Sequence, residues 1–326
     1  LKEENSNYTF QSKTDKIGFR KRFITVPSDT AYVLRMFKET VDYKFKRARQ
    51  VSQNKLSFGY EGDGKAMQVK LLSEAPENFT SILTKEKGKD TLNYWYRPKL
   101  EVDSLIFEVT HLQSIDTVVV RIKDSKSDSL VFKSESSQLK LLEPYKLSAT
   151  IPLDSIDESK VRVRDKDSLF QGASMVLDSF SNMVDLNFDK TEKNTYNIQI
   201  LPGAFIDFYG AQNDTLNFKA TTKLASDYGN LRINIRNGAY PLVVQVTDLK
   251  GVVVESFNAQ DASPIDFKDV IPGTYLLRAI FDLNQNGLYD TGRYLNKTQP
   301  ERVSYASEPI EVRAGWDTTE EFILDD

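Results

Sequence analysis

Short runs of apolar residues, each bounded by turn residues, recur along the whole chain and limit what it can fold into. The runs have the length of β-strands and are rich in the Val, Ile, Tyr and Phe that strands favour. In residues 275–281 the side chains alternate with a period of two. We expect strands at residues 55–60, 67–72, 92–96, 104–110, 116–122, 160–163, 195–201, 216–221, 231–235, 242–247, 251–257 and 275–282. So many short strands predict an all-β chain of tandem β-sandwiches.

Turn-rich joints divide the chain into units of sandwich size. We expect the C-terminal tail of a preceding sandwich at residues 1–46 and complete sandwiches at residues 47–138, 139–226 and 227–326. Within the tail we favour a strand over a helix at residues 30–41, because Pro27 precedes it and its neighbours are β-branched. The last sandwich opens with a hairpin that turns at Asp248–Gly251, where the glycine permits a positive φ.

Composition excludes several classes of protein. The formal net charge is −4, without the basic surplus of nucleic-acid-binding proteins, so we expect no nucleic-acid partner. The chain has no cysteine and therefore neither disulfides nor thiolate metal sites. No apolar run approaches the ~20 residues that span a bilayer. The chain opens at Leu1 without Met, which we interpret as a mature or truncated piece.

One loop near the end of the chain carries residue types that bind calcium. The candidate metal ligands are Asp282, Asn284, Asn286, Leu288 and Asp290. Side-chain oxygens spaced two residues apart can curl around one ion, and Gly287 permits the sharp turn between them. Leu288 would contribute its backbone carbonyl, and the last carboxylate would bind directly or through water. The sequence therefore predicts one Ca²⁺ site.

The loop differs from a helical EF-hand. Where that pattern has its final glutamate, this chain has Arg293, so we expect a loop that follows a strand. Because Ca²⁺ takes roughly six to eight oxygens, the site needs water or an outside carboxylate to complete its shell. The alternative interpretation is an ion-free Asn/Gly turn held by Asx hydrogen bonds.

A degenerate copy of the loop lies near the start of the chain. Its metal-type residues are Glu3, Asn5, Asn7 and Gln11. Their spacing matches the later loop, but Tyr8 replaces the turn glycine and Gln11 is neutral, so ion binding is less favoured there. After each loop come a proline and a strand candidate, at residues 23–36 and 303–322. This repeat is the reason for interpreting residues 1–46 as the tail of a sandwich like the last one.

The sequence gives less support to other candidate functional sites. His111 is the only histidine and ends an apolar strand, which is typical of a satisfied edge histidine. No Gly-x-Ser-x-Gly, phosphate-loop or dinucleotide pattern is present, so we expect no enzyme. Basic and aromatic residues alternate at 43–49, which favours a charged edge strand over an anionic-glycan surface. Tyr94, Trp95 and Tyr96 are either core residues or a sugar-binding platform.

Several segments resemble known families. Residues 201–210 and 213–216 resemble the end of an SbsA-type bacterial Ig-like domain, and residues 145–150 and 155–157 resemble its opening. Residues 271–275 and the loop that follows resemble prealbumin-like sandwiches of the carboxypeptidase-regulatory or Cna-B type. The combination is similar to outer-membrane-anchored lipoproteins of Bacteroidetes-type bacteria. The resemblance implies an extracytoplasmic location, in the periplasm or at the cell surface, and no enzymatic activity. It also implies membrane association only through an N-terminal lipid anchor that is not present in this chain.

An Asp-Ser/Thr pattern recurs along the chain and resembles the O-glycosylation signal that such bacteria use on exported proteins. The candidate positions are Thr30, Thr91, Ser104, Thr117, Ser129, Ser155, Ser168, Thr215 and Thr318. The alternative is ordinary turn chemistry ahead of strands.

Taken together, the sequence predicts a non-enzymatic structural and interaction protein of the cell envelope. Its partner would be another envelope protein or a glycan. The alternative function is a glycan-binding module or an accessory subunit of an outer-membrane assembly.

Overall fold

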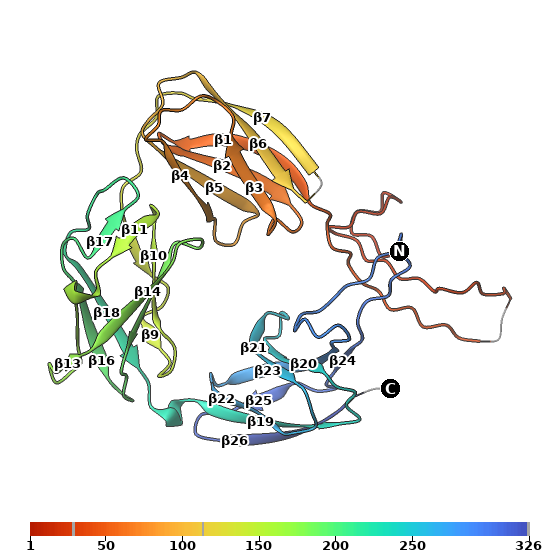
Figure 1. Ribbon diagram of the computed structural model, residues 1–326. Helices are drawn as coiled ribbons and strands as arrows, with labels where there is room; N and C mark the ends of the chain where they lie inside the picture. Colours follow the sequence, from red (N-terminus) through yellow and green to blue (C-terminus); the bar gives the residue numbers. More distant parts are fainter. Residues whose placement is uncertain (28–29, 113, 325–326) are drawn as a thin grey trace. The chain divides into compact units, whose positions relative to one another are not determined.

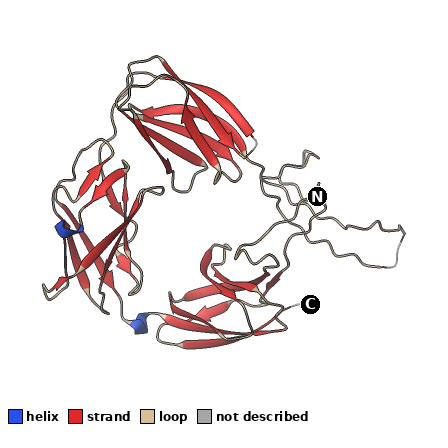
Figure 2. Ribbon diagram, viewed as in Figure 1, coloured by secondary structure: helices blue, strands red, loops and turns tan. Residues whose placement is uncertain are grey.

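The computed structural model describes all residues except 28–29, 113 and 325–326, and it divides into two compact units. One unit is residues 42–223, and the other combines residues 1–41 with residues 224–326. Among the described residues the helical elements are two short turns, η1 (Glu158–Lys160) and η2 (Ala225–Asp227), and the remaining elements are strands (Figure 2). The prediction of an all-β chain of tandem sandwiches is confirmed.

The first sandwich occupies the start of the larger unit. Its strands are β1 (Lys44–Ser52), β2 (Lys55–Glu61), β3 (Met67–Leu71), β4 (Thr80–Lys85), β5 (Thr91–Arg97), β6 (Ser104–His111) and β7 (Ser114–Arg121). A sheet of order β1-β2-β5-β4 packs on a sheet of order β3-β6-β7 (Figure 1). Phe58 and Phe107 are fully buried between the sheets, with ring centroids 5.2 Å apart in an edge-to-face arrangement.

The second sandwich completes this unit. Its strands are β8 (Phe132–Ser134), β9 (Gln138–Leu139), β10 (Tyr145–Ala149), β11 (Leu153–Ile156), β12 (Val161–Arg164), β13 (Phe170–Gln171), β14 (Ala173–Asp178), β15 (Met183–Phe188), β16 (Thr195–Ile200), β17 (Phe205–Asp207) and β18 (Leu216–Thr222). The sheets have the orders β14-β15-β10-β8 and β13-β12-β16-β18-β9, with a separate β11-β17 pair. Gly203 takes a positive φ of 74°, and the chain then inserts Ala204 and Phe205 into the core.

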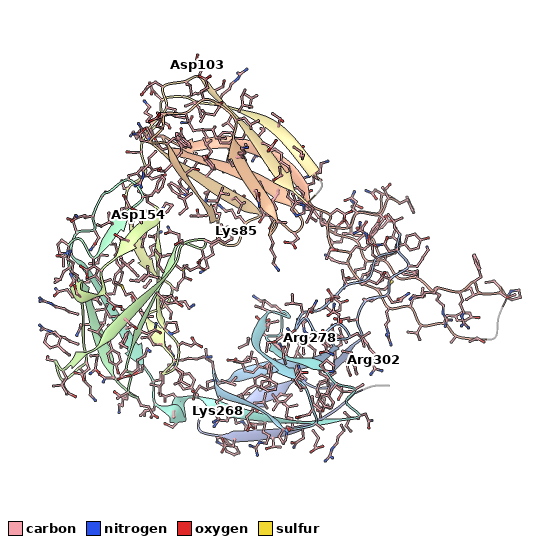
Figure 3. All side chains as sticks on the ribbon, in the orientation of Figure 1. Lys85, Asp103, Asp154, Lys268, Arg278 and Arg302 are labelled. Atoms are coloured by element: carbon pink, nitrogen blue, oxygen red, sulfur yellow. The ribbon has the colours of Figure 1, made fainter. Side chains whose placement is uncertain are left out.

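A small apolar cluster joins the two sandwiches of this unit. Trp95, Ile151 and Phe208 are each almost completely buried in it. The Arg97 guanidinium lies 4.5 Å from the centroid of the Phe208 ring and donates to the backbone oxygen of Phe208. Lys85 and Asp154, labelled in Figure 3, also lie at the junction: the backbone N–H of Lys85 donates to the carbonyl of a residue in the second sandwich, and Asp154 lies 4.0 Å from Arg97.

The third sandwich lies in the smaller unit. Its strands are β19 (Gly229–Arg236), β20 (Leu242–Thr247), β21 (Val253–Ala259), β22 (Ile265–Val270), β23 (Gly273–Phe281), β24 (Val303–Tyr305), β25 (Ile310–Val312) and β26 (Asp317–Ile323). The sheet β22-β19-β26 contains a parallel β19-β26 pair. It packs on the sheet β21-β20-β23-β24, in which β25 also pairs with β23.

The hairpin predicted at the start of this sandwich is confirmed. Its strands β20 and β21 pair antiparallel, and Gly251 takes a φ of 84° between them. The Asp248 carboxylate accepts the backbone N–H groups of Lys250 at 2.8 Å and Val252 at 2.9 Å. The turn residues thus help to fix the register of the two strands.

Residues 1–41 form no regular strand in the part of this segment that the structure describes. Its backbone pairs are isolated bridges, Lys2 with Lys16 and Ile17 with Phe37. The predicted strand at residues 30–41 is therefore wrong. The reason is physical: a strand needs a neighbour for its N–H and C=O groups, and within this stretch Phe37 alone lies in a bridge.

Candidate metal centre

The loop at residues 282–290 follows the end of β23, which pairs with β20 on one side and with β24 on the other. Along β23, Tyr275, Leu277, Ala279 and Phe281 face the core, as their alternation predicts. Asp282 follows directly and is 4 % exposed, and its N–H donates to the carbonyl of residue 241 at 3.2 Å. Figure 3 labels Arg278 on β23 and Arg302 beyond the loop, whose guanidinium stacks 3.6 Å from the Phe281 ring centroid.

The Asp282 carboxylate organises the first half of the loop. Its two oxygens accept the backbone N–H groups of Asn286 at 3.1 Å and Gly287 at 2.8 Å. Gln285 and Gly287 both take a positive φ, of 62° and 73°. The chain therefore folds back over the carboxylate, which is the sharp turn that the glycine predicts.

The second half of the loop converges on Asp290. The side-chain amides of Asn284 and Asn286 both donate to the same oxygen of its carboxylate. The side-chain oxygen of Asn286 accepts the backbone N–H of Leu288 at 2.8 Å, while the Leu288 side chain is exposed. The structure thus brings the polar side chains proposed as ligands together around one ring of backbone.

Glu301 closes the loop from outside, and sequence reasoning missed it. Its carboxylate accepts the N–H of Leu283 at 3.0 Å and the N–H of Asp290 at 2.9 Å, so it clamps both ends of the ring. Its own N–H donates to the Asp290 carbonyl at 2.9 Å, and the residue is 9 % exposed. The sequence signal was the need for an outside carboxylate, but spacing did not indicate which residue would supply it.

The donor set suits a hard cation with a mixed oxygen shell. Among the described residues, no three His, Cys, Asp or Glu side chains lie together so as to hold a metal ion. An ion here would therefore take Asp282 and Asp290, amide oxygens of Asn284 and Asn286, a backbone carbonyl and water. Such neutral oxygens belong to the ordinary shell of Ca²⁺, while Zn²⁺ sites depend on nitrogen and sulfur ligands.

The degenerate N-terminal loop shares several of these internal hydrogen bonds. The Glu3 carboxylate accepts the N–H of Tyr8 at 2.8 Å, as Asp282 accepts that of Gly287. The remaining matches are Asn7 with Thr9, Asn5 with Gln11, and a positive φ at both Ser6 and Tyr8. The repeat that the sequence indicates is therefore present in the backbone, even though Tyr8 takes the place of glycine.

The N-terminal loop even has its own clamp. The buried Asp15 carboxylate accepts the N–H of Glu4 at 3.3 Å and the N–H of Gln11 at 2.8 Å. These bonds match those that Glu301 makes at the two ends of the later loop. With a neutral Gln11 in place of Asp290, this loop offers less negative charge to a cation.

The single histidine has a structural environment. The His111 ring stacks on Tyr43, with centroids 3.7 Å apart. Burial, with the Asp116 charge as the next cause, raises the pKa of Tyr43 to about 12. The predicted edge position of His111 is wrong, because β6 lies between β3 and β7.

The basic strand β1 lies at a sheet edge as predicted, where Lys46 pairs with Glu61 at 2.5 Å.

The aromatic run on β5 is buried on both faces. Tyr94 and Tyr96 lie in the core of the first sandwich, and Trp95 points the opposite way into the junction cluster. The Trp95 indole N–H donates to Thr84 Oγ1 at 2.9 Å. A sugar-binding platform at these residues is therefore wrong, since no ring face is free for a ligand.

The candidate glycosylation positions lie mostly on the surface. Thr91 and Thr318 are half-buried, and the other side chains are exposed, namely those of Thr30, Ser104, Thr117, Ser129, Ser155, Ser168 and Thr215. Asp29, the acidic residue ahead of Thr30, lies outside the described residues. Glycosylation itself stays a prediction.

Comparisons with known proteins give distant structural similarities. No protein-family model matches the chain, and no curated protein sequence matches it. Its fold is similar to a Bacillus anthracis TIE protein, with 13 % identity and a TM-score of 0.21 over 63 % of this chain and 42 % of that one. It is also similar to domains 4–9 of the surface layer protein SbsC, with 11 % identity and a TM-score of 0.26 over 86 % of this chain and 51 % of that one. A crystal structure of consecutive titin domains gives 11 % identity and a TM-score of 0.19 over 85 % of this chain and 99 % of that one. Separately, no helix among the described residues is long and apolar enough to cross a bilayer.

Proposed function

We propose that this chain is a non-enzymatic structural and interaction protein whose last sandwich is stabilised by one Ca²⁺ at residues 282–290. The observation that carries the proposal is the closed, oxygen-lined ring at the end of β23, clamped at both ends by Glu301. The chain around it consists of β-sandwiches with packed cores, which suits a protein that spaces or presents surfaces.

Calcium would act by holding in place the end of β23, where the chain enters the loop at Asp282. In the ion-free ring, the amides of Asn284 and Asn286 hold Asp290 in place. An ion would replace these hydrogen bonds by bonds to the carboxylates and amide oxygens, and its positive charge would balance the negative charge of Asp282 and Asp290. Because β23 pairs with β20, β24 and β25, holding its end holds both the sheet and the returning chain.

Calcium is expected to raise the melting temperature of the third sandwich. At a hundredfold excess over its dissociation constant, an ion that binds only the folded state adds about 2.7 kcal/mol. For a domain of this size that corresponds to roughly 10 °C. Differential scanning calorimetry in Ca²⁺ and in chelator measures the shift. Asp290→Ala should abolish it, and Glu308→Ala, which removes an exposed carboxylate of the same sandwich, should leave it unchanged. Equal melting temperatures in both buffers for the unmodified chain would reject the site.

The location that we propose is the bacterial cell envelope, as part of an outer-membrane-anchored lipoprotein facing the periplasm or the cell surface. The support is the resemblance of residues 139–226 and 227–326 to domains of such proteins. The partner that we favour is another envelope protein. A glycan-binding role is less favoured, because the aromatic residues that suggested it are in the core.

A further inference from the structure

Residues 17–26 and 30–36 expose apolar side chains that a folded sandwich would bury. Ile24, Val26, Leu34 and Met36 are 47 %, 80 %, 47 % and 38 % exposed. Figure 1 draws this part of the chain without strand arrows. A depression of about 620 Å³ is lined by residues 19–24 together with Tyr32, Val33, Arg35 and Gln299. Such exposed apolar surface marks a site that another element covers.

The N-terminal loop sets the register in which this segment can be compared with the third sandwich. Lys2 donates its N–H to the carbonyl of Lys16 at 2.8 Å, as Phe281 does to Arg302 at 2.9 Å. Together with the matching clamps, this places Lys2 where β23 ends and Lys16 just ahead of the residue that starts β24. Residues 17–26 and 30–36 therefore correspond to the returning half of a sandwich, β24 to β26.

In that register the exposed apolar residues fall on core positions. Counting on from Lys16 and Arg302, Ile24 and Val26 take the places of Ile310 and Val312. Aligning the Asp-Thr pairs at 29–30 and 317–318 puts Leu34 and Met36 at the places of Phe322 and Leu324. The four counterparts are between 1 % and 6 % exposed in the core of the third sandwich.

The residues between them fall on surface positions. Thr25 and Val33 take the places of Glu311 and Glu321, which are exposed on β25 and β26. The side chains of residues 24–26 and 33–36 thus alternate in the way that a strand with one buried face requires.

We propose that residues 17–26 and 30–36 are the back half of a further β-sandwich and form a docking surface for a front half like residues 229–281, carried by the same polypeptide. Residues 17–26 would pair antiparallel with a β23-like strand, as β24 and β25 do. Residues 30–36 would pair parallel with a β19-like strand, as β26 does. The proposal is independent of calcium, because the two clamps that set the register are hydrogen bonds to carboxylates.

The test supplies such a front half from sequence already in the chain. A duplicate of residues 224–279 is fused directly ahead of Leu1, which then takes the place of Ile280. Trypsin cleavage after Arg20, Lys21, Arg22 and Arg35 is followed by mass spectrometry in the fusion and in the unmodified chain. We expect cleavage to slow by about tenfold or more in the fusion, because covered strands must open before they are cut.

A matched pair of variants separates a half core from a merely sticky segment. Val26 and Val33 are 80 % and 85 % exposed, but only Val26 falls on a core position. In the fusion, Val26→Glu should restore fast cleavage, while Val33→Glu should leave the protection intact. The proposal is overturned if the fusion is cut as fast as the unmodified chain, or if the two variants lose protection equally. It is also overturned if anionic vesicles protect residues 19–36 in the unmodified chain while the fused half does not, because the segment would then be a membrane anchor.

Discussion

Trp95→Ala is expected to lower the free energy of unfolding of the unit at residues 42–223 by about 3–5 kcal/mol, the usual cost of removing a large buried aromatic side chain. The indole is 2 % exposed and packs against Ile151 and Phe208 of the second sandwich. In the native chain the indole N–H donates to Thr84 Oγ1. The substitution therefore leaves this buried hydroxyl oxygen without its donor.

This substitution should also uncouple the two sandwiches. Trp95 lies outside both main cores, so each sandwich keeps its own packed interior. We therefore expect denaturant unfolding of this unit to separate into two transitions. Circular dichroism measures the transitions. The chain offers a matched control, because its other tryptophan, Trp316, is 61 % exposed and Trp316→Ala should change stability little. A single transition at the original midpoint in Trp95→Ala would contradict the account.

Glu301→Ala is expected to destabilise the third sandwich by about 2–5 kcal/mol. The carboxylate accepts two backbone N–H groups at opposite ends of the 282–290 ring, and a hydrogen bond to a charged acceptor contributes about 1.5–3 kcal/mol, less where the donor residue is exposed, as Leu283 is. Chemical denaturation in chelator isolates this effect from any ion.

Two further variants give this prediction its controls. Glu301→Gln keeps one acceptor oxygen and should fall between Glu301→Ala and the unmodified chain. Glu308→Ala removes an exposed carboxylate from the same sandwich and should be nearly neutral. If Glu301→Ala and Glu308→Ala have the same midpoint, Glu301 is not a clamp.

Local patterns in the sequence predict much of the fold. Period-two alternation and turn residues locate strands such as β6 and β23, because a strand with one buried face must alternate and a tight turn needs particular residues. The loop at residues 282–290 is predictable for the same reason, since its oxygen donors and its glycine lie within one short stretch.

What the sequence does not predict depends on contacts between distant residues. Glu301 clamps the ring only because the chain returns past β23, which no spacing rule states. Trp95 alternates with the Tyr94 and Tyr96 pair, and alternation alone cannot tell that both faces of β5 are covered. The strand expected at residues 30–41 fails because strand formation needs a partner as well as a propensity.

Calorimetric titration of the chelator-treated chain with Ca²⁺ tests the central claim most directly. We expect saturable binding of one ion per chain, lost in Asp290→Ala and kept in Glu3→Ala, since the N-terminal loop has a neutral glutamine in place of the last carboxylate. An unmodified chain that gives no binding heat, and whose loop is insensitive to Asp290→Ala, would contradict the account.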